Sequence, residues 1–119
     1  MGLYAELKIL NDEEGHRTFH GRKFVGDILF DYEYYGEEEA TLNKILTKDE
    51  YKVIRPIPYG DFDIELQNPN EFKTIILKIK KQLKIDNLYN EYKKDFKDIL
   101  FVCDKAIELN KQIYFTYSN

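Results

Sequence analysis

The spacing of apolar residues changes twice along this 119-residue chain, and this change constrains the fold more than any other feature. Residues 3–10 alternate apolar and polar side chains, which predicts a strand with one buried face. Residues 68–83 and 87–110 instead carry apolar side chains at every third or fourth position, as amphipathic helices do. The closing residues 110–119 return to β-branched and aromatic side chains, and they predict a terminal strand that can enter the middle of a sheet.

Further elements are expected between the first strand and the long helices. Residues 24–35 alternate again, so we expect a second strand, antiparallel to the first through a long hairpin. Residues 37–46 begin with acids that suit a helix dipole and predict a short helix. Thr47 and Glu50 have the spacing of a capping box that begins another helical turn or two.

A third strand is expected over residues 61–66, with Leu66 inward, and Asn70 is the expected cap of the helix that follows. Together these elements predict an α+β fold, a single mixed β-sheet of about four strands covered by two long C-terminal helices. A two-layer or three-layer α/β arrangement is the alternative, because periodicity alone does not decide between them. The length is that of one globular domain over residues 1–119.

The charge is unevenly distributed around a formal net charge of -4. Residues 1–69 hold 15 acids against 8 Lys and Arg, whereas residues 70–119 hold 7 acids against 10, so the two parts present different surfaces. The single cysteine, Cys103, cannot form an internal disulfide, and no apolar run approaches the roughly 18 to 20 residues needed to cross a bilayer. We therefore expect a cytoplasmic protein without a signal peptide, a membrane partner or a cofactor.

Both histidines of the chain lie in the segment HRTFHGRK, residues 16–23. His16 and His20 are four residues apart and can face one side, as an acid–base pair or two metal ligands must. No third ligand has a diagnostic spacing, so no structural zinc is expected. Arg17, Arg22 and Lys23 better suit a phosphate, with the histidines as catalytic groups. The alternative is that these are exposed residues of a strand and a turn.

Residues 27–39, here called the acidic tyrosine segment, hold six acids, four aromatics and no Lys or Arg. Tyrosine supplies rigid contact area, and clustered carboxylates steer a basic partner. The expected partner-binding residues are Asp31, Tyr32, Glu33, Tyr34, Tyr35, Glu37, Glu38 and Glu39. Alternatively, the tyrosines fill the core and the acids form the wet face of a strand.

Residues 33–47 resemble the tyrosine-glycine-helix segment of barstar-type ribonuclease inhibitors. The matching residues are E-Y-Y-G-E at 33–37, followed by Leu42, Leu46 and Thr47. The closing helix and strand also follow the order of that family. The resemblance implies a small α/β inhibitor that blocks a basic nuclease site, with Tyr34 at the family's contact tyrosine. The chain departs from the family at the positions of its two helix aspartates and its tryptophan, which hold Ala40, Lys44 and Asn43. Another departure is the strand expected ahead of Glu33, where the family has a helix.

Two further charged groups have weaker functional interpretations. Asp61, Asp63 and Glu65 share one face of the expected third strand and could bind Mg²⁺, although a solvated strand face is the default. The segment IILKIKKQLKI, residues 75–85, forms a lysine-coated helix face without arginine or interleaved aromatics. A nucleic-acid partner is therefore not expected.

These observations favour a small acidic, non-enzymatic protein-binding module of the immunity, antitoxin or inhibitor type that neutralises a basic protein. The first alternative is a phosphate-substrate enzyme or an anion-binding protein that uses the cluster of His16, Arg17, His20 and Arg22. The second is a structural subunit of a larger assembly. The sequence leaves enzymatic activity and homo-oligomerisation open.

Overall fold

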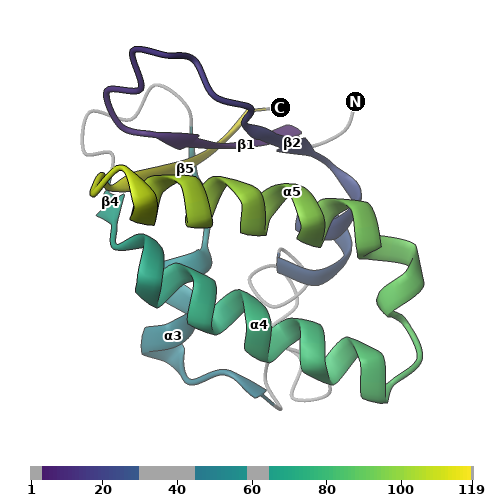
Figure 1. Ribbon diagram of the computed structural model, residues 1–119. Coiled ribbons are helices and arrows are strands. Elements are labelled where there is room, and N and C mark those ends of the chain that lie inside the picture. The colour runs from purple at the N-terminus through teal and green to yellow at the C-terminus, as the bar shows by residue number, and fades with distance from the viewer. Residues whose placement is uncertain (1–3, 30–44, 59–64, 119) are drawn as a thin grey trace.

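The computed structural model describes residues 4–29, 45–58 and 65–118, and it shows an α+β fold with one mixed sheet (Figure 1). The strands are β1 (Tyr4–Ile9), β2 (Phe19–Gly21), β3 (Ile57–Pro58), β4 (Leu66–Gln67) and β5 (Ile113–Ser118). The helices are η1 (Val25–Leu29, a π-helix), α3 (Lys48–Ile54), α4 (Pro69–Ile85) and α5 (Tyr89–Glu108). The predicted fold class is confirmed, and the described residues contribute five strands to the sheet.

The closing strand β5 lies in the middle of the sheet, whose order is β2-β1-β5-β3. It pairs antiparallel with β1 along its whole length, from Tyr4 opposite Ser118 to Ile9 opposite Ile113. On its other side it pairs in parallel with β3 and antiparallel with β4. The predicted central position of the last strand is therefore confirmed.

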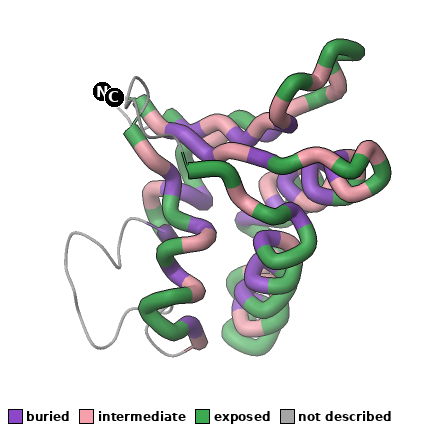
Figure 2. Tube along the Cα trace, turned by 90° about the vertical axis from the view of Figure 1, so that its left-hand side faces the viewer, coloured by how far each residue is buried: buried purple, intermediate pink, exposed green. Residues whose placement is uncertain are grey.

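One face of the sheet is covered by the long helices. Ala5, Leu7 and Ile9 of β1 point into the core, as their alternation predicted. Helix α5 lies against β1 and β2 and packs along α4. The described helices all lie on this side of the sheet (Figure 1). Figure 2 shows buried residues where helices and strands face one another.

The helix cores follow the predicted apolar spacing. In α4 the predicted stripe is buried, and the residues are Phe72, Ile75, Ile76, Ile79 and Leu83. In α5 the buried residues are Tyr92, Phe96, Ile99, Val102, Cys103 and Ala106. The Phe72 ring meets the Phe115 ring edge-on at 5.8 Å between centroids, which joins α4 to β5. No helix in the described ranges is long and apolar enough to cross a bilayer.

The prediction of a strand over residues 24–35 is wrong for residues 24–29, the part that the structure describes. Val25–Leu29 forms a π-helix, and residues 30–35 lie outside the described ranges. Four residues here are buried, namely Phe24, Val25, Ile28 and Leu29. They form two adjacent pairs four residues apart, so a helix can bury all four on one face. The strand that follows β1 in sequence and pairs antiparallel with it is instead the short strand β2.

Two details of the third strand and the helix after it also differ from expectation. Asn68 caps α4, because its side-chain oxygen accepts hydrogen bonds from the backbone N–H groups of Asn70 and Glu71 at 2.8 and 3.3 Å. Asn70 is inside the helix, since Pro69 occupies the first turn. Leu66 is 42% exposed and does not point inward.

The capping box of α3 is confirmed. The Thr47 side chain accepts a hydrogen bond from the Glu50 backbone N–H, while Thr47 N–H donates to the Glu50 carboxylate. The helix ends at Ile54, before Pro56 removes a backbone donor. Of the short helix expected over residues 37–46, residues 37–44 lie outside the described ranges.

Candidate functional site

The candidate site is the face of the sheet that points away from the helices, here called the open face. Because strand side chains alternate, burial of Ala5, Leu7 and Ile9 turns the other residues of β1 to this face. Register places Glu6 of β1 between His20 of β2 and Thr116 of β5. The open face therefore carries a row of polar side chains across three strands.

A hollow of about 620 Å³ lies on the open face over β1, β4 and β5. Tyr4, Glu6 and Lys8 line it from β1, and Tyr114 and Thr116 line it from β5. Leu66 of β4 also lines it. At 37% and 42% exposed, Tyr4 and Leu66 are among the most accessible large apolar side chains of the described residues. The hollow thus combines aromatic and apolar contact area with a few polar groups, as binding sites commonly do.

His20 is the centre of a hydrogen-bonded cluster at the edge of this hollow. Its Nε2 lies 2.6 Å from Thr18 Oγ1, and its Nδ1 lies 2.5 Å from the Tyr4 hydroxyl. Glu6 Oε2 is 3.3 Å from the same Nδ1, and Glu6 also forms an ion pair with Lys8. The imidazole is therefore held in one orientation by partners on both nitrogens.

His16 has a separate set of partners in the turn after β1. Its backbone N–H donates to Asp12 Oδ2 at 2.6 Å, and its Nδ1 lies 2.8 Å from Asp12 Oδ1. Its Nε2 lies 3.2 Å from a Glu14 carboxylate oxygen. The hydrogen bonds with His16 lower the pKa of Asp12. Among the residues that the structure describes, His16 and His20 therefore contact different residues and share no hydrogen-bond partner.

Two cations of HRTFHGRK, Arg17 and Lys23, lie beside aromatic rings of α5. Arg17 lies over the Phe101 ring of α5, with 4.3 Å between Cζ and the ring centroid, and 3.9 Å from Asp98. The Lys23 ammonium is 5.7 Å from the centroid of another α5 ring, while Arg22 is exposed. Two of the cations therefore lie along α5, whereas His20 lies on the open face.

The remaining predicted sites can be placed only in part. The eight predicted partner-binding residues of the acidic tyrosine segment lie outside the described ranges, and so do Asp61 and Asp63. Glu65 is exposed. Within residues 4–29, 45–58 and 65–118, no group of three or more His, Cys, Asp and Glu side chains could hold a metal ion.

Three residues of this site were not predicted from the sequence, namely Tyr4, Glu6 and Lys8. Their alternation indicated the solvent side of a strand, but their contacts with His20 depend on the pairing of β1 with β2. No signal in the local sequence shows that pairing. Comparisons of the chain with protein families, curated proteins and solved structures gave no match.

Proposed function

We propose that the protein is a non-enzymatic protein-binding module of the inhibitor, immunity or antitoxin type, and that a partner docks on its open face. The observation that carries the proposal is the hollow of about 620 Å³, beside which Tyr4 and Leu66 are exposed. Tyrosines provide rigid amphipathic anchors in protein interfaces. The polar row around Glu6 supplies groups that fix the orientation of a partner.

The charge of the chain indicates a basic partner. The balance of residues 1–69 is -7, and the acidic tyrosine segment has no Lys or Arg. A negative surface accelerates the approach of a positive protein and disfavours acidic competitors. The proposal also includes a cytoplasmic location, which agrees with a buried Cys103 whose pKa burial raises to about 12.

The alternative of a phosphate-substrate enzyme or anion binder has weaker support. Carboxylates already lie near two of its residues, since Glu6 is 3.3 Å from His20 and Asp98 is 3.9 Å from Arg17. An anion would have to compete with them. Under this alternative, replacing both His16 and His20 with alanine should abolish binding or turnover of a phosphate ester.

Capture from native lysate with matched baits tests the proposed function. The baits are the wild type, Tyr4→Ala on the open face, and Leu77→Ala as a control, because Leu77 is also exposed, at 41%, but lies on α4. A third variant, Tyr34→Ala with Tyr35→Ala, tests the acidic tyrosine segment. We expect a basic protein that is retained by the wild type and the control at low salt and released at high salt.

The captured protein is then purified and its affinity for each bait is measured by calorimetry. If Tyr4 is an anchor of the interface, its truncation should weaken binding by roughly 30-fold or more. Equal affinity of the wild type and Tyr4→Ala would refute docking on the open face, provided that circular dichroism shows both are folded. Tight self-association in high salt, without a second protein, would instead support a structural subunit.

A further inference from the structure

A second surface of the molecule carries a regular row of positive charge. Tyr89, Lys93, Lys97 and Phe101 follow one another at intervals of four residues on α5. Four helical residues rise about 6 Å, so the row is about 18 Å long. At 3.6 residues per turn, each step of four residues also turns about 40° around the helix, so these four form a stripe that winds gradually around α5.

The two aromatic ends of this stripe also present cations. Lys80 and Lys84 of α4 lie over the Tyr89 ring, with their ammonium groups 5.4 and 4.9 Å from its centroid. Arg17 lies over the Phe101 ring at 4.3 Å. Every position of the stripe therefore has a positive charge, supplied by α4, α5 and the segment before β2. We call these five cations, Arg17, Lys80, Lys84, Lys93 and Lys97, the basic row.

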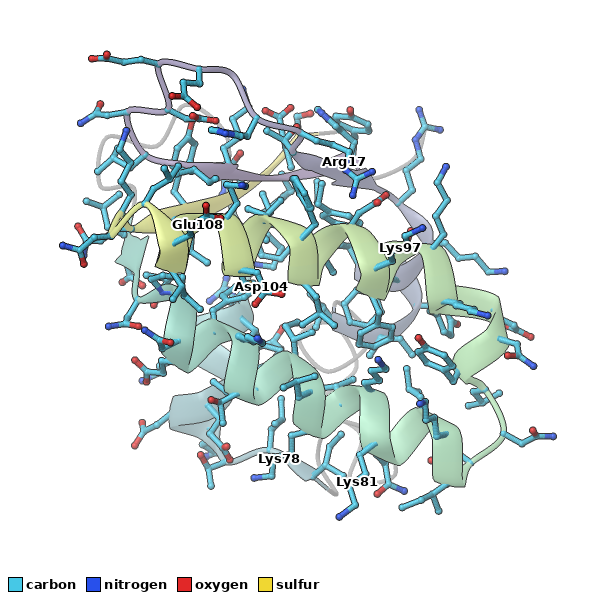
Figure 3. The ribbon with its side chains drawn as sticks, viewed as in Figure 1. Arg17, Lys78, Lys81, Lys97, Asp104 and Glu108 are labelled. Atoms are coloured by element: carbon cyan, nitrogen blue, oxygen red, sulfur yellow. The ribbon has the colours of Figure 1, made fainter. Side chains whose placement is uncertain are left out.

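Of the basic row, Arg17 has an ion pair within the described ranges, with Asp98 at 3.9 Å. A hollow of about 420 Å³ lies along it, lined by Arg17, Lys80, Lys93 and Lys97 and by apolar side chains such as Leu100. Asp104 also lines this hollow, but its Oδ1 is 2.5 Å from the Lys73 ammonium. Figure 3 shows Arg17 above α5, and Asp104 on the side of α5 that faces α4.

The lysines of the row are free to accept an anionic partner. Within the described ranges, Lys80, Lys93 and Lys97 form no ion pair with a carboxylate, and Lys93 and Lys97 are exposed. By comparison, Lys78 on the same helix as Lys80 is paired with Glu50 at 3.1 Å. Lys80, Lys93 and Lys97 therefore contribute positive charge that no carboxylate of the described residues neutralises.

We infer that the basic row binds an acidic peptide segment of a partner protein in an extended conformation. Side chains on one side of an extended peptide repeat about every 6.6 Å, close to the roughly 6 Å between cations of the row. About six extended residues would span it, with carboxylates at alternate positions facing the cations. The Leu100 side chain gives the stems of those residues an apolar contact.

Two other classes of ligand fit the row less well. A drug-sized molecule is usually largely enclosed by its pocket, whereas exposed Lys93 and Lys97 border an open surface. Single-stranded nucleic acid needs ring faces on which bases stack, and cations already lie over Tyr89 and Phe101. The inference does not depend on the proposed function, because the open face is on the opposite side of the sheet from α5.

The test measures the binding of labelled synthetic peptides to the full chain by fluorescence anisotropy. The probe is an eight-residue peptide of alternating Glu and Thr. A second peptide has the same composition with its glutamates in one block, and a third has Gln in place of Glu. The variants are Lys93→Gln with Lys97→Gln, and the control Lys48→Gln with Lys52→Gln, which removes two exposed lysines four residues apart on α3.

The alternating acidic peptide should bind the wild type and the α3 control equally, and the α5 variant roughly tenfold more weakly, from two lost ion pairs. Binding should fall with added salt, and the Gln peptide should not bind. Equal loss in both lysine variants would overturn the inference, because only net charge would then matter. So would equal binding of the block peptide, no binding of the acidic peptide, or tighter binding of an oligothymidine through the same lysines.

Discussion

Strand β2 should be intolerant of any side chain at Gly21. A Cβ at this position would lie 2.6 Å from Cζ and 3.0 Å from Cε2 of the Phe19 ring. Phe19 has no exposed surface, and its ring packs against Phe115 with 6.3 Å between centroids. The ring therefore cannot withdraw without displacing the core. Overpacking of this kind typically costs about 1–3 kcal/mol, a considerable part of the roughly 5–15 kcal/mol that stabilises a domain.

Thermal and urea unfolding of Gly21→Ala, followed by circular dichroism, measures this cost. The matched control is Gly26→Ala in η1, since a Cβ there meets nothing within 4 Å. The control should be neutral, or more stable by up to about 1 kcal/mol, because alanine restricts the unfolded chain. Equal stability of Gly21→Ala and the wild type would refute the packing of Phe19 beneath β2. It would also question the position of His20, which this strand carries.

Three further predictions concern the caps and the cysteine. Asn68→Ala should lower the free energy of unfolding by about 1 kcal/mol, whereas Asn70→Ala should have little effect; equal losses in urea titrations would contradict the assignment of the cap. The hydrogen bond from the Thr47 backbone lowers the pKa of Glu50 below 4.5, so its stabilising contribution is present above pH 4.5 and is lost as the pH falls through the folded value. The melting temperatures of the wild type and Glu50→Ala should therefore converge in acid, and a constant difference would count against this. Cys103 should react with a thiol reagent only as fast as the protein opens, because burial raises its pKa to about 12, and rapid reaction of the folded protein would show that it is accessible.

The long periodic elements were predictable because burial of one face dominates their energetics. The alternation in β1 and the apolar stripe of α4 each have one arrangement that buries all their large apolar residues. Residues 25–29 were mispredicted because five residues are too few to distinguish the alternation of a strand from the 3.6-residue period of a helix. Phe24, Val25, Ile28 and Leu29 are buried through helical spacing. At the start of α4, two asparagines flank Pro69. Because proline prefers the first helical turn, the residue before it, Asn68, is the cap of the helix.

The candidate site was less predictable than the fold because its contacts join distant parts of the chain. His20 was identified from its own segment, but the Tyr4 hydroxyl and the Glu6 carboxylate reach it only across a strand pairing. The basic row has the same origin. Arg17 and Lys80 belong to segments more than sixty residues apart in sequence, and α5 brings them to one surface.

The central position of β5 has a consequence for the order in which the protein can fold while it is being synthesised. Strand β1 leaves the ribosome first, yet its longest neighbour is the segment Ile113–Ser118, synthesised more than a hundred residues later. Until β5 has been synthesised, the edge of β1 that pairs with it has no partner strand. Contacts this distant in sequence slow folding, because a long loop must close before they form. A nascent chain that stalls after α5 would carry the two long helices α4 and α5 and an exposed edge of β1. Chaperones bind species of this kind, and such species aggregate when chaperones are scarce.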